Sequence, residues 1–243
     1  MRACGKTDVG LRRHENQDTF AVEQGKKLLI AVVCDGMGGA EGGQIASSVA
    51  VETFMKEMRA LIRADMTAEQ LRALASFCVA KANTAVYQRA LQDPAYQGMG
   101  TTLVAVLILK SLSALVLNIG DSRAYLLNSD GVRCVTVDHS LVELMVQRGE
   151  LTPEQAKTYP GKNLITRAVG TEPEVEGVLY VQELHKDDCL LLCSDGLSNE
   201  MDDQEILFEV VHGMKKSTCC ERLLSIAKNR GAPDNVTVVL AAV

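Results

Sequence analysis

The chain has 243 residues, of which 47% are hydrophobic and 23% are charged, and this composition is typical of a globular protein with a sizeable core. Its 25 basic and 31 acidic residues give a net charge of -6, which excludes a broad nucleic-acid-binding surface because such a surface needs a basic excess. Residues 1–10 lack the apolar centre of a signal peptide, and polar residues interrupt the apolar stretch 103–119. We therefore expect a cytoplasmic protein that binds no nucleic acid and no membrane.

The eight cysteines lie mostly inside apolar runs, and none has the Cys-x-x-Cys spacing that is typical of a zinc site. We interpret them as reduced thiols of the core. The sequence contains no repeat, low-complexity segment or Pro/Gly/Ser-rich linker. Residues 1–243 are therefore expected to form a single domain.

The first part of the chain predicts one strand and two helices. Residues 28–34 form a short continuous apolar run, which is typical of a buried strand. A glycine-rich turn then leads into a helix over residues 40–58. A second helix begins near Thr67, which has capping-box spacing to Gln70 and is followed by apolar residues at helical spacing.

The rest of the chain is richer in strands. Strands are expected at 101–109, 112–119, 123–128, 132–137, 175–182, 189–193 and 236–243, and helices at 141–148, 153 onward, 203–211 and 217–228. Asp130-Gly131 predicts a tight hairpin turn, and Thr152 predicts a helix cap before Pro153. Strands and helices do not alternate along the whole chain, so a doubly wound fold is excluded and a sheet sandwich with flanking helices is expected.

Four aspartates lie at the ends of predicted buried strands, namely Asp35, Asp121, Asp195 and Asp234. Carboxylates that converge from separate strands repel one another, so either protons or cations must compensate them. No histidine lies beside them, which favours Mg²⁺ or Mn²⁺ over zinc. An Asp-Gly pair at a strand end is more often a simple turn, and the pattern alone leaves both interpretations open.

Eight short motifs occur in a fixed order along nearly the whole chain. They are residues 10–18 (GLRRHENQD), 35–39 (DGMGG), 100–102 (GTT), 120–125 (GDSRAY), 138–140 (DHS), 164–170 (LITRAVG), 193–197 (CSDGL) and 234–237 (DNVT). Each motif alone is weak, but the ordered set resembles the type 2C protein phosphatases, the metal-dependent PPM family. The resemblance is greatest to compact bacterial members that consist of the catalytic domain alone.

The resemblance implies a fold and a metal site. The fold is α+β, with a central β-sandwich of two antiparallel sheets flanked by pairs of helices in four layers. Asp35 would bridge two central Mn²⁺ or Mg²⁺ ions, and the carbonyl of Gly36 would bind one of them. Asp195 and Asp234 would complete the coordination of the second ion, and Asp121 together with Asp195 would hold a third ion.

The resemblance also implies the reaction, which is hydrolysis of phosphoserine and phosphothreonine in proteins. Arg13 would bind the substrate phosphate, and Asp18 would order metal-bound water. A water bridging the two central ions would attack phosphorus in line, without a covalent phosphoenzyme. Substrates of a serine/threonine kinase are the expected partners of a monomeric enzyme. Two alternatives stay open: a catalytically silent pseudophosphatase that binds phosphoproteins, and a phosphatase of small phosphorylated metabolites.

The chain departs from the family pattern at three positions. Gln17 stands where some members have glutamate, and Met37 stands where the eukaryotic branch has a histidine proposed as general acid. We therefore expect the leaving oxygen to take its proton from a metal-bound water. Residues 143–162 resemble the mobile flap of bacterial members, but Tyr159 replaces a common histidine. We predict that His139 fixes the turn before this flap and is not a catalytic base.

Overall fold

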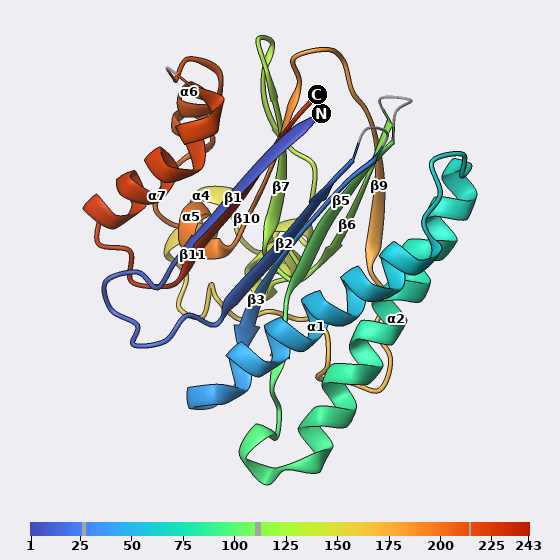
Figure 1. The fold of residues 1–243 in the computed structure, drawn as a ribbon. Helices are drawn as coiled ribbons and strands as arrows, with labels where there is room; N and C mark the ends of the chain where they lie inside the picture. Colours follow the sequence, from blue (N-terminus) through green and yellow to red (C-terminus); the bar gives the residue numbers. More distant parts are fainter. Residues whose placement is uncertain (26–27, 110–112, 214) are drawn as a thin grey trace.

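The computed structural model describes residues 1–25, 28–109, 113–213 and 215–243. At its centre, two antiparallel sheets pack face to face, and helices cover both outer faces (Figure 1). This is the predicted α+β sandwich in four layers. No helix in the described ranges is long and apolar enough to cross a membrane.

The first sheet contains both ends of the chain. Its strands, in spatial order, are β1 (Arg2–Asp8), β11 (Val236–Ala242), β10 (Cys189–Cys193), β7 (Arg123–Asn128) and β8 (Gly131–Cys134). Arg2 lies opposite Ala242, so the two termini are adjacent. The predicted hairpin is confirmed, because β7 and β8 pair across the turn that contains Asp130.

The second sheet is built around the predicted apolar strand. Its strands are β2 (Asp18–Gln24), β3 (Leu28–Met37), β5 (Leu103–Leu109), β6 (Ser113–Ile119) and β9 (Val178–Glu183), and the short β4 (Gly100–Thr101) pairs with the end of β3. The side chains of β3 point alternately to the two faces of the sheet. Leu29 and Val33 belong to the core between the sheets, whereas Ile30 and Val32 belong to the core under the helices. Both faces are buried, which explains the uninterrupted apolar run.

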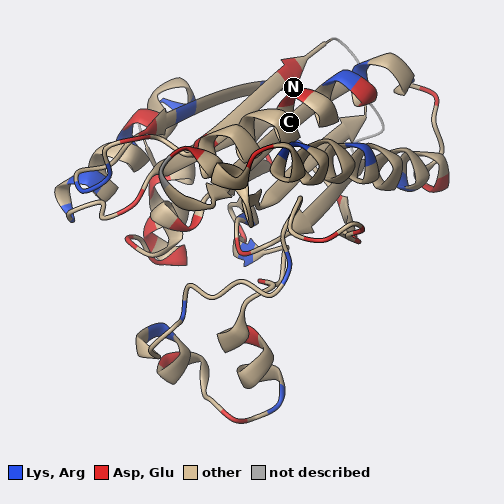
Figure 2. Cartoon of the chain, turned by 90° about the horizontal axis from the view of Figure 1, so that it is seen from below, with Lys and Arg blue, Asp and Glu red and all other residues tan. Residues whose placement is uncertain are grey.

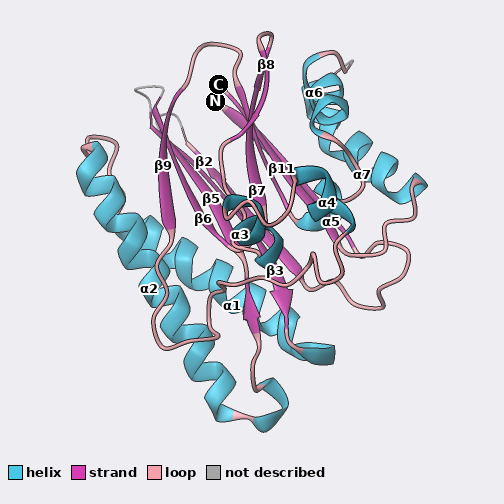
Figure 3. Ribbon diagram, turned by 180° about the vertical axis from the view of Figure 1, so that it is seen from behind, coloured by secondary structure: helices cyan, strands magenta, loops and turns pink. Residues whose placement is uncertain are grey.

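Two pairs of helices form the outer layers. Helices α1 (Gly39–Leu61) and α2 (Ala68–Gln92) cover the second sheet, and α6 (Asp203–Val211) and α7 (Cys219–Asn229) cover the first (Figures 1 and 3). The predicted capping box of α2 is present, because Thr67 and Gln70 bond reciprocally. Shorter helical turns are η1 (Pro94–Tyr96), α5 (Asp195–Ser198) and η2 (Lys216–Thr218).

The segment between β8 and β9 carries two short helices that project from the sandwich (Figure 2). They are α3 (Leu141–Gln147) and α4 (Pro153–Thr158), and neither contains a buried residue. Thr152 caps α4 together with Gln155, as predicted. This part of the chain therefore owes little of its structure to the hydrophobic core.

Some boundaries differ from the prediction. The strands β1 and β2 were not predicted, because their sequences mix charged and apolar residues and their stability comes from pairing with β11 and β3. The strand predicted at 132–137 ends at Cys134, and the strand predicted from residue 175 begins at Val178. The predicted start at residue 112 lies outside the described residues.

Candidate active site

The antiparallel pairing of the first sheet brings three aspartates to one of its ends. Strand β10 runs antiparallel to β7 and β11, so its last residue, Cys193, lies opposite residues near their beginnings. Asp195 lies two residues after the end of β10, and Asp121 and Asp234 lie two residues before the beginnings of β7 and β11. Residues so close to paired strand ends remain near one another, because the ladder fixes the backbone on which they stand.

The second sheet contributes Asp35 and Asp18. The two residues lie directly opposite each other in the register of β2 and β3. The backbone of Asp35 is held on both sides: its N–H donates to Thr102 Oγ1 at 2.9 Å, and its carbonyl accepts a hydrogen bond from Thr101 Oγ1 at 2.8 Å. Because these bonds come from the neighbouring strands, they hold Asp35 in place despite the charge opposite it.

Four of these aspartates line one cavity. The cavity has a volume of about 600 Å³, and its lining includes Asp35, Asp121, Asp195 and Asp234 together with Gly36 and Arg13. Glycine is required at position 36, because a Cβ there would lie 2.0 Å from the carbonyl oxygen of Gly43. The tight approach of helix α1 to the end of β3 thus depends on this residue.

Burial and mutual repulsion make the aspartates difficult to ionise. The pKa of Asp35 is raised well above its ordinary value by burial and then by the charge of Asp18. Burial followed by the charge of Asp195 raises the pKa of Asp121 to about 7. The pKa of Asp195 is raised by burial and by Asp234. The cavity is therefore an environment in which positive charge is strongly stabilised.

Arg13 supplies one positive charge at this cavity. Its Nη2 donates to Asp234 Oδ2 at 2.8 Å, and this bond raises the pKa of the guanidinium. The side chain remains 54% exposed, so its other donors can reach a ligand in the cavity. Arg12 also lines the cavity, but no hydrogen bond or ion pair of its side chain occurs among the described contacts.

Asp18 lies beneath the cavity and is only 6% exposed. Its Oδ2 accepts a hydrogen bond from Ser194 Oγ at 2.7 Å, and Ser194 Oγ in turn accepts one from the N–H of Thr237 at 3.0 Å. Its Oδ1 is buried without a partner among the described residues. Burial raises the pKa of Asp18 to about 6. The sequence analysis did not identify Ser194 as the residue that orients this carboxylate.

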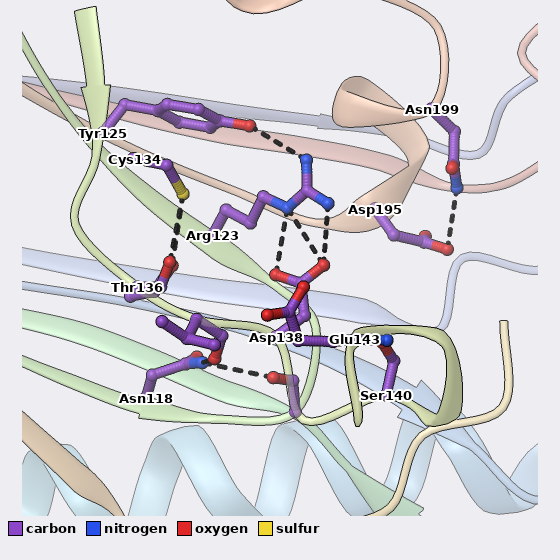
Figure 4. Close-up of polar contacts among 12 residues, drawn as sticks. Asn118, Arg123, Tyr125, Cys134, Thr136, Asp138, Ser140, Glu143, Asp195 and Asn199 are labelled. Atoms are coloured by element: carbon purple, nitrogen blue, oxygen red, sulfur yellow. Dashed lines mark hydrogen bonds and ion pairs between the residues drawn. The ribbon is translucent and has the colours of Figure 1, made fainter. Parts of the chain in front are cut away.

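A network of polar side chains surrounds Arg123, two residues after Asp121 (Figure 4). Arg123 donates from Nε and Nη2 to the carboxylate of Asp138, at 3.0 and 2.7 Å, and its Nη1 donates to the hydroxyl of Tyr125 at 3.3 Å. Burial disfavours the charged form of Arg123, but the hydrogen bonds to Asp138 outweigh the effect of burial and raise the pKa of Arg123. The ion pair joins the beginning of β7 to the segment that enters α3.

His139 completes this network through the backbone. The N–H of Gly120 donates to His139 Nδ1 at 3.1 Å, and the N–H of His139 donates to the carbonyl oxygen of Gly120 at 2.9 Å. The carbonyl oxygen of His139 accepts from Thr166, which follows α4. Burial, followed by the charge of Arg167, lowers the pKa of His139, which favours the neutral ring. His139 therefore fixes the turn before the flap, as predicted.

Two asparagines that the sequence analysis did not identify orient the remaining parts of the site. Asn199 donates from Nδ2 to Asp195 Oδ2 at 3.0 Å. Asn235 accepts from the N–H of Gln17 at 2.8 Å and donates from Nδ2 to the carbonyl oxygens of Val9 and Glu15. The second asparagine thus ties the segment that carries Arg13 to the beginning of β11. Its position next to Asp234 in the motif DNVT is the signal that could have identified it.

Of the three positions that depart from the family pattern, two line the cavity and one does not. Gln17 and Met37 line the cavity, and Gln17 Nε2 donates to the carbonyl oxygen of Gly39 at 2.9 Å. Tyr159 ends helix α4 outside the lining of the cavity. Gln17 therefore connects two parts of the cavity wall, a role that its replacement of glutamate alone did not predict.

The donor set suits hard divalent cations. The carboxylates supply oxygen ligands, and the mutual repulsion that raises their pKa values is relieved when a cation is bound. Within the described ranges, no three His, Cys, Asp or Glu side chains form a preassembled metal-ligand group. The carboxylates instead surround a cavity with room for water, and Mg²⁺ typically keeps several waters between itself and the protein.

A sandwich of two antiparallel sheets with paired helices outside, and a carboxylate-lined cavity at the strand ends, is the arrangement that the resemblance to the metal-dependent phosphatases implies. The sequence profile described as "Protein phosphatase 2C" matches residues 12–224. The serine/threonine phosphatase stp of Listeria innocua is 37% identical over 244 residues, covering 99% of this chain and 95% of that protein.

Solved structures agree with this assignment. The S. agalactiae serine/threonine phosphatase superposes with a TM-score of 0.93 at 32% identity, covering 100% of this chain and 99% of that one. The catalytic domain of the serine/threonine protein phosphatase PstP, solved in complex with two manganese ions, has a TM-score of 0.84 and 35% identity, with 98% and 96% of the two chains covered. The chain belongs to the protein phosphatase 2C family and is a metal-dependent serine/threonine protein phosphatase.

Proposed function

We propose that Asp35, Gly36, Asp121, Asp195 and Asp234 hold the divalent cations with which this phosphatase hydrolyses phosphoserine and phosphothreonine. The observation that carries the proposal is that all five residues line one cavity of about 600 Å³. Three of them have carboxyl pKa values raised by burial and by neighbouring aspartates. A site that disfavours its own negative charge in this way gains most from binding cations.

The position of each residue suggests its share in the site. Asp35, which lies opposite Asp18 and feels the charges of the other three aspartates, would bridge two central ions, and the carbonyl of Gly36 would bind one of them. Asp195 and Asp234 would complete the coordination of the second central ion, and Asp121 with Asp195 would hold a third ion. When bound, Mn²⁺ or Mg²⁺ polarises phosphoryl oxygens and lowers the pKa of water.

The chain's own groups would bind and orient the reactants. Arg13 would turn part of its guanidinium from Asp234 to the phosphoryl oxygens of the substrate, for which a planar group with several donors is suited. The buried Oδ1 of Asp18 would accept a hydrogen bond from a water in the cavity. His139 is not part of the cavity lining, and its Nδ1 accepts from the N–H of Gly120, so we assign it a role in holding the turn and assign the leaving-group proton to water.

We further propose a setting for the enzyme. It would act in the cytoplasm as a monomer, on proteins phosphorylated by a serine/threonine kinase. All eight cysteines are free thiols in the structure, which suits a reducing compartment. The projecting segment 143–162 contains α4 and most of α3. It is followed by Asn163 and Ile165, which help to line the cavity. We propose that this segment contacts the phosphoprotein beside the cavity.

The test is phosphate release from a phosphothreonine peptide, with Mn²⁺ and with EDTA. We expect activity that requires Mn²⁺ and is lost in Asp195→Ala, whereas Asp203→Ala, which alters an exposed aspartate at the start of α6, keeps it. An active Asp195→Ala variant would contradict the metal assignment. An inactive wild type that still binds the peptide would indicate a pseudophosphatase, and preferential turnover of sugar phosphates would indicate a metabolite phosphatase.

A further inference from the structure

Two cysteines from opposite ends of the chain meet on the side of the sandwich that α7 covers. Cys4 lies in β1 and Cys220 lies in the first turn of α7, and their Sγ atoms are 3.4 Å apart. Cys220 Sγ also lies 3.4 Å from the carbonyl oxygen of Cys4, so its single S–H can donate either to that oxygen or to Cys4 Sγ. Helix α7 packs across β1 and β11, so the contact belongs to the core of the fold (Figure 1).

The two thiols differ in reactivity in complementary ways. Cys4 is partly exposed, and the hydrogen bond with Cys220 lowers its pKa, so Cys4 ionises more readily than Cys220. Cys220 is only 1% exposed, and the same bond together with burial raises its pKa. Cys4 therefore has the character of an attacking thiolate, and Cys220 that of the thiol that resolves the product.

We propose that Cys4 and Cys220 form a disulfide when the protein meets hydrogen peroxide, and that this bond ties β1 to α7. In the first step, the Cys4 thiolate attacks a peroxide oxygen, the O–O bond breaks, and the released hydroxide takes up a proton to become water. In the second step, Cys220 Sγ attacks the sulfur of the Cys4 sulfenic acid. The S–S bond forms, the S–O bond breaks, and the oxygen leaves as a second water with the proton of Cys220. The peroxide accepts the two electrons that the thiols lose.

The geometry requires little movement. The distance between the sulfurs must shorten from 3.4 Å to about 2.0 Å. Such a bond would join residues 216 positions apart and so enclose most of the chain. Closing so long a loop restricts the unfolded chain, and the oxidised protein should therefore resist unfolding better than the reduced one.

The other cysteines differ from this pair. Cys134 is partly exposed, but its Sγ bonds to Thr136, and burial raises its pKa. Cys34 and Cys193 are fully buried, and burial raises both pKa values. Cys4 and Cys220 do not line the cavity of the aspartates, so the proposal is independent of the metal site.

The experiment treats the reduced full-length protein with hydrogen peroxide at equal concentration, alkylates the remaining thiols with iodoacetamide, and measures intact mass and peptide masses. We expect loss of two hydrogen atoms, one peptide pair linked through Cys4 and Cys220, reversal by dithiothreitol, and a higher urea midpoint before reversal. Cys220→Ser should leave a Cys4 sulfenic acid that dimedone traps. Cys4→Ser should form no disulfide, and Cys134→Ser should behave as the wild type.

Two results would overturn the proposal. One is that, in the wild type treated with peroxide, both Cys4 and Cys220 are still free thiols and are fully alkylated by iodoacetamide. The other is that the linked peptides contain a different pair of cysteines. Both are read from the wild-type protein, so neither depends on whether a variant folds.

Discussion

Replacing Asp18, a residue of the proposed active site, by asparagine should favour folding more at pH 8 than at pH 4 when no metal is bound. The pKa of Asp18 is raised in the folded state, because burial disfavours its charge. A group with a raised carboxyl pKa favours folding when it is protonated. Its contribution is therefore fully present below the unfolded value and is lost as pH rises through the folded value. At pH 8 the charge of the ionised Asp18 opposes folding, and a neutral asparagine has no such charge.

The size of the effect follows from the shift. A rise in pKa from 3.8 to about 6 corresponds to about 3 kcal/mol, at about 1.4 kcal/mol per pH unit. Asparagine keeps an oxygen that can accept the hydrogen bond of Ser194, but its amide N–H2 would take the place of Oδ1, which is buried without a partner among the described residues. That unpaired donor costs about 1–3 kcal/mol at every pH. We therefore expect the change in the free energy of unfolding caused by Asp18→Asn to be about 2–3 kcal/mol more favourable at pH 8 than at pH 4.

Urea unfolding of the EDTA-treated protein at both pH values measures this difference. Asp8→Asn is a matched control with the opposite sign. At Asp8, burial opposes ionisation, but the hydrogen bond from Lys228 at 2.8 Å outweighs it and lowers the pKa. This control should therefore destabilise the protein at pH 8. If Asp18→Asn lowered the free energy of unfolding equally at pH 8 and pH 4, the reasoning from burial and repulsion would be refuted.

Three further substitutions test other parts of the site. Gly36→Ala should lower the free energy of unfolding in urea by about 1–3 kcal/mol and raise the Mn²⁺ concentration needed for half-maximal activity, because its Cβ meets a backbone carbonyl oxygen. Unchanged values of both quantities would contradict this close approach. Asp138→Asn should cost about 1–3 kcal/mol in urea unfolding by weakening the ion pair with Arg123, and a neutral result would show that the pair does not stabilise the turn. Arg13→Lys should lower kcat/KM for a phosphopeptide about 10-fold, because about 1.4 kcal/mol of phosphate binding is lost. Arg12→Lys should leave kcat/KM unchanged. Equal effects of the two substitutions would contradict the assignment of phosphate binding to Arg13.

Local patterns predicted the elements whose stability is mostly local or fully buried. The apolar run around Ile30, the cap at Thr67 and the turn at Asp130 each carry a signal within a few residues, and the structure has each of them. Strands β1 and β2 carry no such signal. The partner of β1 is β11, more than two hundred residues away, and periodicity contains no information about such a partner. The partner of β2 is the neighbouring β3, but the mixed sequence of β2 shows no strand pattern of its own.

The site divides in the same way. The positions of Asp35, Asp121 and Asp195 at strand ends could be read from the apolar runs that precede them. That Asp18 lies opposite Asp35 depends on the register of an unpredicted strand. The supporting role of Ser194 likewise depends on three separate strands that meet at its hydroxyl. Such contacts follow from the tertiary structure, which no local pattern specifies.

The cost of buried negative charge explains why the aspartates stand in or next to paired strands. Burial makes an ionised Asp18 cost about 3 kcal/mol at pH 8, and on a flexible segment its carboxylate would turn toward water. The strands cannot move in this way, because the core between the sheets holds them: complete burial of two side chains such as Leu190 and Leu192 contributes about 3–6 kcal/mol, enough to offset that cost. A divalent cation bound in the cavity would offset the same kind of cost for the aspartates that line it. The rigidity of the sandwich is therefore a condition for the affinity of the metal site, and substitutions that loosen this core should weaken metal binding before they unfold the protein.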